Sequence, residues 1–285
     1  MVSILVLWDV DQTLAETGGV GRHLYQLAFT EMFGGVLPRP GSMAGRTDRA
    51  IALEVLTLAG VPEPRRQVRA FEALLAAHAP GLAGLVREHA RALPGAAAAM
   101  AALADGAALA DRAALADRAA LADRADRADR ADRAALADRA ALADRADRAD
   151  GAGARRAGHV VQSLLTGNIR ALAEVKLSPL GLTEHLDLAV GAYGDASEVR
   201  ADLVPLARGL AALAYGRDFD GTATILVGDT PRDVEAALVT GARAVGVATG
   251  SYAAAELAAA GAHAVLDDLT DTRQVLAAIL AAPVP

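Results

Sequence analysis

Residues 2–14 read VSILVLWDVDQTL, a nearly continuous apolar run that ends in two aspartates. A run of seven such residues, from Val2 to Trp8, is typical of a strand buried on both faces of a parallel sheet. Asp9 and Asp11 follow two positions apart, so they leave the strand on the same side and can share a site where the chain turns. One carboxylate can then attack phosphorus while the other protonates the leaving oxygen and activates water. Solvated loop aspartates at this spacing are common, so the pair alone is weak evidence.

Further apolar runs along the chain also end in polar clusters. Residues 159–165 lead into Thr166-Gly167-Asn168, residues 223–227 lead into Gly228-Asp229, and shorter runs cover 244–248 and 264–266. Helical patterns separate them, at residues 169–177, 202–215, 231–240 and 253–260. Strands that alternate with helices predict an α/β fold with a doubly wound parallel sheet. In such sheets the functional site lies at the carboxyl ends of the strands, which is where these polar clusters fall.

Residues 17–93 break this rhythm, because they show only helical patterns, at 20–33, 48–59, 63–78 and 82–92. A helical block placed after the first strand predicts an inserted cap domain. We therefore expect an α/β catalytic core made of residues 1–16 and 94–285 and a helical cap made of residues 17–93.

Residues 104–150 form a low-complexity insertion within this core, built from Ala-Ala-Leu-Ala-Asp-Arg and Ala-Asp-Arg repeats. Six residues advance about 240° around a helix, so Leu109, Leu115 and Leu121 would point to three different faces. Because no apolar stripe results, the segment is predicted to be a repeat expansion tolerated in a surface loop. An arm that binds a partner is the alternative.

The composition narrows the classes of partner and location. A formal net charge of −7 provides no basic excess for nucleic acid, and the absence of cysteine excludes disulfides and thiolate metal sites. Asp9 and Asp11 interrupt the first apolar run, which is unlike a signal peptide, and no run is long enough to span a bilayer. We expect a cytoplasmic protein that binds a small molecule and neither membrane nor nucleic acid; monomer and homodimer both stay open.

The second polar cluster offers groups that bind phosphate. Thr166, Gly167 and Asn168 combine a hydroxyl with backbone amides at a helix start, although an ordinary helix N-cap has the same pattern. Lys176, ten residues after Thr166, supplies an ammonium suited to phosphate oxygens. Lys176 and Asn168 are the single lysine and the single asparagine of a chain with 27 arginines, which makes a chance surface lysine a weaker explanation.

The third polar cluster offers ligands for a metal ion. Asp229 ends the strand pattern and Asp233 lies one helical turn later. Mg²⁺ prefers a few hard oxygen ligands and keeps several waters. Asp9, the carbonyl of Asp11 and Asp229 could supply such ligands, with Asp233 behind them; the alternative is that Asp233 only supports the helix N-terminus.

These elements, in this order, resemble the haloacid dehalogenase superfamily of phosphohydrolases over the whole chain except the repeats. The resemblance implies that Asp9 is the nucleophile, Asp11 the general acid/base, Thr166 and Lys176 the phosphate binders, and Asp229 and Asp233 the metal acids with Mg²⁺ as cofactor. The position of the cap resembles the phosphoglycolate phosphatase-like branch, which implies hydrolysis of a small phosphorylated metabolite through an aspartyl-phosphate. Gln12 departs from the family, which most often has glycine there.

Other activities of this superfamily can be sorted by residue type. Its dehalogenases lack the second aspartate, and Asp11 is present here. Its phosphonatases use a cap lysine, and residues 17–93 contain none. Sugar-phosphate mutases of the beta-phosphoglucomutase type share all the motifs and remain the alternative, as does an inactive fold that binds a partner through its repeats.

Recognition of the substrate is expected from the cap. Gly45-Arg46-Thr47-Asp48 resembles a cap loop of the phosphoglycolate branch, and Arg46 could hold a substrate carboxylate with two hydrogen bonds. Equally, Thr47 or Asp48 could cap the next helix while Arg46 lies on the surface. Arg22 and His23 are further candidates.

Overall fold

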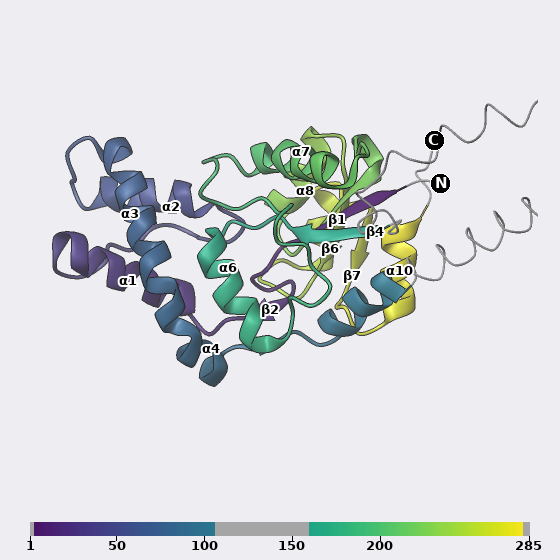
Figure 1. Cartoon of the computed structure of the whole chain (residues 1–285), viewed down its shortest axis with the longest axis horizontal. Helices are drawn as coiled ribbons and strands as arrows, with labels where there is room; N and C mark the ends of the chain where they lie inside the picture. The colour runs from purple at the N-terminus through teal and green to yellow at the C-terminus, as the bar shows by residue number, and fades with distance from the viewer. Residues whose placement is uncertain (1–2, 106–159, 282–285) are drawn as a thin grey trace, which may run out of the picture.

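The computed structural model describes residues 3–105 and 160–281 and contains a parallel sheet of five strands (Figure 1). The strands lie in the order β4-β1-β5-β6-β7. Their bounds are Ile4–Trp8 for β1, Val160–Leu164 for β4, Thr224–Gly228 for β5, Arg243–Val247 for β6 and Ala264–Leu266 for β7. The first and last residues of each strand lie within two positions of those predicted from the sequence. The predicted doubly wound α/β fold is therefore confirmed.

Helices cover both faces of the sheet because the strand residues alternate between two apolar clusters. Val6 and Trp8 face a helix that begins at residue 96 together with α6 (Arg170–Leu177) and α10 (Thr272–Leu280). Leu5 and Leu7 face α7 (Leu203–Tyr215), α8 (Pro231–Val239) and α9 (Ala254–Ala259). Side chains of neighbouring strand residues point to opposite faces, so one short apolar strand supplies both halves of the core.

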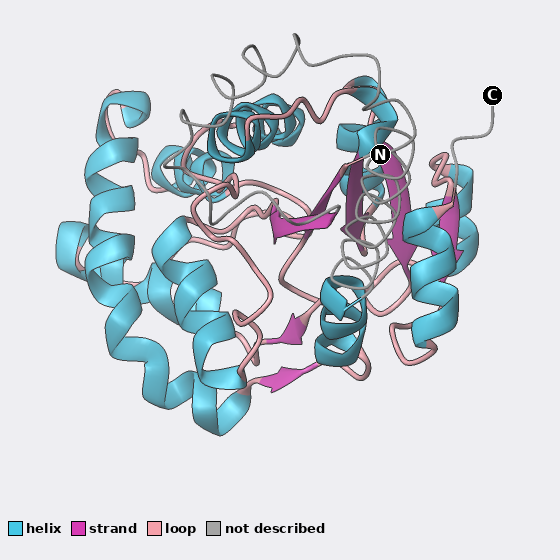
Figure 2. Ribbon diagram, turned by 45° about the vertical axis from the view of Figure 1, so that its right-hand side comes forward, coloured by secondary structure: helices cyan, strands magenta, loops and turns pink. Residues whose placement is uncertain are grey.

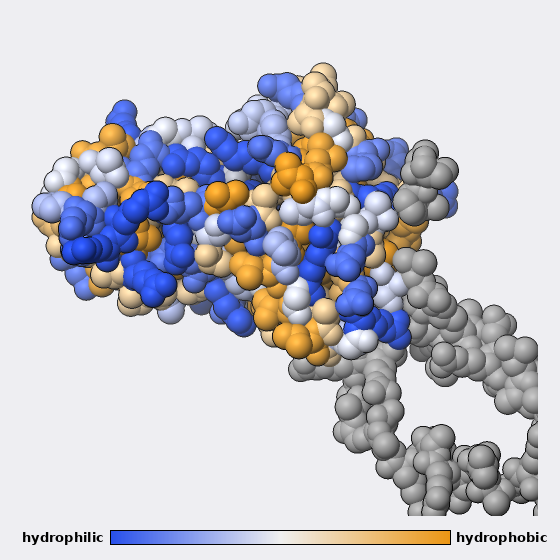
Figure 3. All heavy atoms as spheres, turned by 90° about the horizontal axis from the view of Figure 1, so that it is seen from above, coloured by the Kyte–Doolittle hydropathy of each residue, from blue (hydrophilic) through white to orange (hydrophobic). Residues whose placement is uncertain are grey.

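Four helices form a separate block beside the sheet: α1 (Val20–Phe33), α2 (Asp48–Leu58), α3 (Pro64–His78) and α4 (Ala83–His89) (Figure 2). Their inner faces make an apolar cluster of their own, which includes Leu24, Val55, Phe71 and Leu75. Hydrophilic side chains cover much of the outside of this block (Figure 3). Helix α6 adds Leu172 and Val175 to the same cluster, so this core helix packs against the block as well as the sheet. The exact division at residues 17 and 93 stays a prediction.

A short antiparallel pair, β2 (Ala15–Glu16) with β3 (Arg91–Ala92), joins the two chain segments that run between the block and the core. The Leu93 amide also donates to the Leu14 carbonyl at 2.9 Å. This pair was not predicted, because two residues per strand carry no recognisable period. Helix α10 was not predicted either.

The predictions for the repeats at 104–150 fall almost entirely outside the described residues. Only Ala104 and Asp105 are described, and both belong to the helix that begins at residue 96. Among the helices of the described parts, none combines the length and apolar character needed to cross a membrane.

Candidate active site

A cavity of about 280 Å³ is lined by residues at the carboxyl ends of β1, β4 and β5 and by residues of the helical block. The sheet side of its lining includes nearly all of the residues singled out from the sequence. Core residues in the lining are Asp9, Asp11, Gln12, Thr166, Gly167, Asn168, Lys176, Arg200 and Asp229. Residues of the helical block in the lining include Arg22, Tyr25, Arg46 and Asp48. The site is therefore shared between the sheet and the block.

Three buried carboxylates meet at the ends of β1 and β5. One oxygen from each of Asp9, Asp229 and Asp233 lies within 4.8 Å of the others, and all three side chains are almost fully buried. Burial raises the pKa of Asp9 to about 6, against the opposing effect of Arg200. Burial, together with the neighbouring charges of Asp9 and Asp233, raises the pKa of Asp229 to about 8. Crowded acids with raised pKa values indicate a place where positive charge is needed.

Arg200, in a short 3₁₀ helix (Arg200–Asp202), supplies part of that charge. Its Nη2 atom lies 2.7 Å from Asp9 Oδ1 and 2.5 Å from Asp233 Oδ1. Burial lowers the pKa of Arg200, but the two carboxylates outweigh burial and raise it above its ordinary value. Its Nε atom is buried without a hydrogen-bond partner. Arg200 was not predicted from the sequence, because one arginine among 27 carries no distinguishing signal.

The acidic group fits a divalent cation. It offers hard carboxylate oxygens, and their mutual repulsion is only partly offset by the single guanidinium of Arg200. Asp233 also supports its own helix, because Thr230 Oγ1 donates to Asp233 Oδ2 at 2.6 Å and the Asp233 amide donates back to Thr230. The two sequence interpretations of Asp233 are thus compatible.

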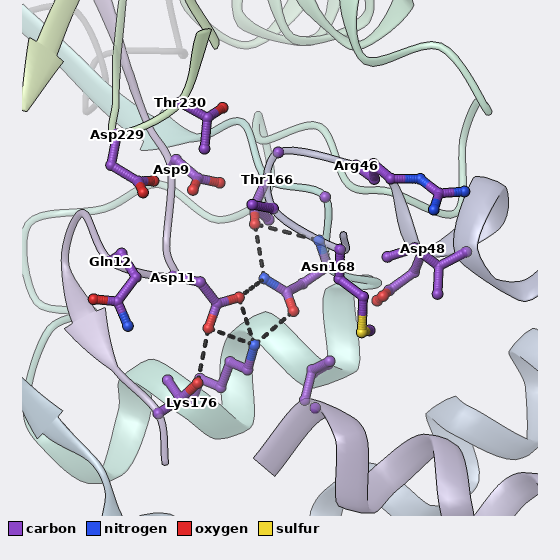
Figure 4. A pocket seen from close by; sticks show the side chains of 18 of the residues that line it. Asp9, Asp11, Gln12, Arg46, Asp48, Thr166, Asn168, Lys176, Asp229 and Thr230 are labelled. Carbon is purple, nitrogen blue, oxygen red and sulfur yellow. Dashed lines mark hydrogen bonds and ion pairs between the residues drawn. The ribbon is translucent and has the colours of Figure 1, made fainter. Parts of the chain in front are cut away.

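Asp11 belongs to a second polar cluster on the other side of the cavity (Figure 4). Lys176 Nζ donates to Asp11 Oδ1 at 2.8 Å and to Asp11 Oδ2 at 2.6 Å, and Asn168 Nδ2 and Thr17 Oγ1 each donate to Asp11 at 2.8 Å. Burial favours the neutral acid, yet the Lys176 charge and these hydrogen bonds hold the pKa of Asp11 below its ordinary value. The Asp11 side chain is 41% exposed, so it remains open to the cavity.

Lys176 is 3% exposed, and its three N–H donors have three acceptors, because Nζ also donates to Asn168 Oδ1 at 2.8 Å. The only lysine and the only asparagine of the chain therefore contact each other and the same carboxylate. Asn168 Nδ2 also donates to Thr166 Oγ1 at 2.9 Å, which turns the fully buried Thr166 hydroxyl toward this cluster. The structure brings Thr166, Asn168 and Lys176 together around Asp11.

Gln12 adopts a left-handed backbone conformation in the turn that follows β1, although it is not a glycine. Its φ angle is 61°, in the left-handed region that glycine adopts without strain. The Gln12 amide donates to the Ala15 carbonyl at 2.8 Å, and Thr249 Oγ1 donates to the Gln12 carbonyl. A non-glycine residue there costs about 1–2 kcal/mol, and these bonds hold the turn in place.

The arginines contributed by the helical block differ in what they contact. Arg46 Nη1 forms an ion pair with Glu54, and its Nη2 donates to the Ala50 carbonyl at 3.3 Å. Its guanidinium points away from Asp9 and Asp11 (Figure 4). The expected contact of Arg46 with a carboxylate of the substrate stays a prediction. Arg22 lies on the first turn of α1, is exposed, and has no hydrogen-bond or ion-pair partner among the described residues.

Comparisons with known proteins agree with this arrangement. Residues 202–272, which include Asp229 and Asp233, match the model of the HAD-hydrolase-like family. No curated protein matches the chain.

Similar solved structures cover nearly the whole chain. A predicted phosphatase from Clostridium acetobutylicum has 13% identity and a TM-score of 0.55, with 97% of this chain and 99% of that chain covered. A hydrolase from Pseudomonas syringae has 18% identity and a TM-score of 0.54, with 95% and 97% covered. A haloacid dehalogenase-like family protein from Streptococcus pneumoniae has 14% identity and a TM-score of 0.50, with 96% and 97% covered. At these identities the likeness shows the fold alone, and the similarity to the HAD-hydrolase-like family covers residues 202–272.

Proposed function

We propose that the protein is a Mg²⁺-dependent phosphatase that hydrolyses phosphomonoesters of small metabolites through a phosphorylated Asp9. The observation that carries this proposal is the placement of Asp9 and Asp11 on one cavity. The Asp9 carboxylate is buried and held by Arg200, whereas the Asp11 carboxylate, two residues later, is held by Lys176 and stays open to the cavity.

The two carboxylates divide the chemistry between them. In the first half, an Asp9 oxygen forms a bond to phosphorus, the bond from phosphorus to the ester oxygen breaks, and Asp11 gives a proton to the leaving oxygen. Because Lys176 holds the Asp11 carboxyl ionised in the free protein, Asp11 must gain that proton in the complex with substrate. In the second half, Asp11 takes a proton from water, whose oxygen attacks the phosphorus of the aspartyl-phosphate. Phosphate leaves and the Asp9 carboxylate is restored.

The cation would be held by Asp9, Asp229 and the carbonyl of Asp11, with Asp233 supporting them. When bound, Mg²⁺ supplies positive charge that offsets the repulsion between Asp9 and a phosphate dianion. Arg200 Nη2 donates to Asp9 Oδ1 at 2.7 Å, and its Nε–H has no acceptor among the described residues, so Arg200 is a further candidate for contact with the phosphoryl group. Thr166 and the amides of Gly167 and Asn168 remain the proposed phosphate contacts, whereas the donors of Lys176 are occupied by Asp11 and Asn168.

The substrate is small and carries a second anionic group, as phosphoglycolate does. A cavity of about 280 Å³ leaves little room beyond a phosphoryl group and a short leaving group. Of the cations that line it, Arg46, Lys176 and Arg200 are already paired with carboxylates, whereas Arg22 has no such partner within residues 3–105 and 160–281. We therefore assign recognition of the second anion to Arg22 ahead of Arg46.

A screen of phosphorylated metabolites with the purified protein, read as phosphate release, tests the activity. We expect release from small phosphomonoesters and a loss of at least about a thousandfold for Asp9→Asn, which keeps the side-chain volume but removes the nucleophile. Asp267→Asn, at an exposed aspartate outside the cavity, is the control. Conversion of a sugar monophosphate into its positional isomer would instead identify a mutase. No turnover of any substrate would favour the inactive fold.

Arg22→Met tests the class of substrate. With 2-phosphoglycolate we expect kcat/KM to fall at least tenfold, a loss of about 1.4 kcal/mol, because the second anion loses its partner. With ethyl phosphate, which lacks that anion, kcat/KM should change less than twofold. Arg46→Met serves as the matched comparison, and the assignment to Arg22 is wrong if Arg46→Met shows the larger selective loss.

If the acidic group binds Mg²⁺, Asp229→Asn should raise the melting temperature without metal but reduce the further rise that Mg²⁺ causes. Asp229→Asn removes a carboxyl whose ionisation is opposed by burial and by the charges of Asp9 and Asp233, so without metal the melting temperature of the variant should exceed that of the wild type. Mg²⁺ should raise the wild-type melting temperature, since saturation at about 100 times Kd contributes about 2.7 kcal/mol. The variant should respond far less. Equal responses of wild type and variant to MgCl₂, followed by differential scanning fluorimetry with and without chelator, would place the metal elsewhere.

A further inference from the structure

Helix α6 carries no capping side chain of its own. Its N-cap residue is Ile169, which makes no side-chain capping bond. Asn168, a residue type that caps helices well, has its side chain committed to Asp11, Thr166 and Lys176. The amides at the start of α6 therefore need an acceptor from another part of the chain.

Asp48 provides that acceptor from the helical block. Its Oδ2 atom accepts the Ile169 amide at 2.7 Å, and its Oδ1 atom accepts the Tyr25 hydroxyl at 2.9 Å. The residue is 5% exposed, and burial raises the pKa of its carboxyl to about 6 in spite of the bond from Ile169. Asp48 thus caps a core helix from outside the core, and both of its oxygens are used.

The backbone around Asp48 is pressed against the same loop. The Asp48 amide donates to the Gly167 carbonyl at 2.6 Å, and the Arg49 amide donates to the Gly194 carbonyl at 3.0 Å. A Cβ atom at Gly167 would lie 1.9 Å from the Arg46 carbonyl oxygen, and one at Gly194 would lie 2.8 Å from the Asp48 amide nitrogen. Only glycines allow this approach.

The start of α2 also holds the loop that leads to Arg200. Thr47 Oγ1 donates to the Glu198 carbonyl at 3.2 Å, and Arg49 Nη1 donates to the Ala196 carbonyl at 3.2 Å. Residues 47–49 consequently bind two loops, one that carries Thr166 and Asn168 and one that precedes the arginine paired with Asp9.

We propose that Asp48 is a positioning residue that, from the helical block, fixes the loop of residues 166–169 so that Asn168 and Thr166 face Asp11. The active site is complete only with the start of α2 docked on it. This inference rests on the proposed phosphatase activity for its kinetic consequence and on contacts alone for its structural one.

The test compares Asp48→Ala, Asp48→Asn and Tyr25→Phe with the matched control Asp271→Ala. Asp271 caps α10 by accepting the Arg273 and Gln274 amides, and it lies outside the cavity lining. Asp48→Ala should lower kcat/KM for the best substrate at least tenfold. Asp48→Asn should stay within about threefold, because its carboxamide oxygen still accepts from Ile169. Tyr25→Phe should lower kcat/KM by an intermediate amount.

Amide hydrogen exchange gives a readout that needs no activity. Asp48→Ala should speed exchange at Ile169 at least tenfold, while Asp271→Ala should leave Ile169 unchanged and affect α10 instead. If wild type releases no phosphate but Ile169 behaves in this way, the proposed function fails and the positioning role stands. Unchanged Ile169 exchange, or equal kinetic losses for Asp48→Ala and Asp271→Ala at equal loss of melting temperature, would overturn the role of Asp48.

Discussion

The mutual repulsion of Asp9, Asp229 and Asp233 is the constraint around which this molecule is arranged. These carboxylates are nearly excluded from water, and their oxygens lie within 4.8 Å of one another. Buried carboxylates in such proximity repel one another, and the apolar side chains of the surrounding core carry no positive charge to offset that repulsion. Arg200 supplies one guanidinium, which bridges Asp9 and Asp233. Burial and the neighbouring charges of Asp9 and Asp233 raise the pKa of Asp229, and the positive charge still missing there fits a divalent cation.

Asp11 and Lys176 form a second charged cluster, separate from the three buried acids. Asp9 and Asp11 therefore lie in different electrostatic environments although they are only two residues apart. Asp9 is buried among acids and shares Arg200, whereas Asp11 is ion-paired with Lys176 and 41% exposed. Under the proposed function, the buried Asp9 would be the nucleophile and the more open Asp11 the acid/base of a two-step phosphoryl transfer. Asn168 links this cluster to the loop that Asp48 caps, so the helical block takes part in organising the site as well as covering it.

The sequence predicted the sheet well because each buried strand is an apolar run that ends in a polar cluster, as at Trp8 and Asp9. It also predicted which residues meet at the sheet edge, since the carboxyl ends of parallel strands lie together. It could not predict Arg200, which has no compositional signal, or the ion pair of Arg46 with Glu54, which depends on side-chain direction. Nor could it reveal that Asp48 caps α6, because a cap contributed from 121 positions away leaves no local pattern.

The central claim is that Asp9 carries the phosphoryl group. Asp11→Asn should slow hydrolysis of the aspartyl-phosphate, so the variant should accumulate this intermediate when it is incubated with Mg²⁺ and acetyl phosphate, whose leaving group needs no proton, and then quenched in acid. Peptide mass spectrometry should then locate one added phosphoryl group on Asp9, and Asp9→Asn should remove it. A phosphoryl group on any other residue, or turnover by the Asp11→Asn variant at the wild-type rate with no phosphorylated protein, would contradict the account.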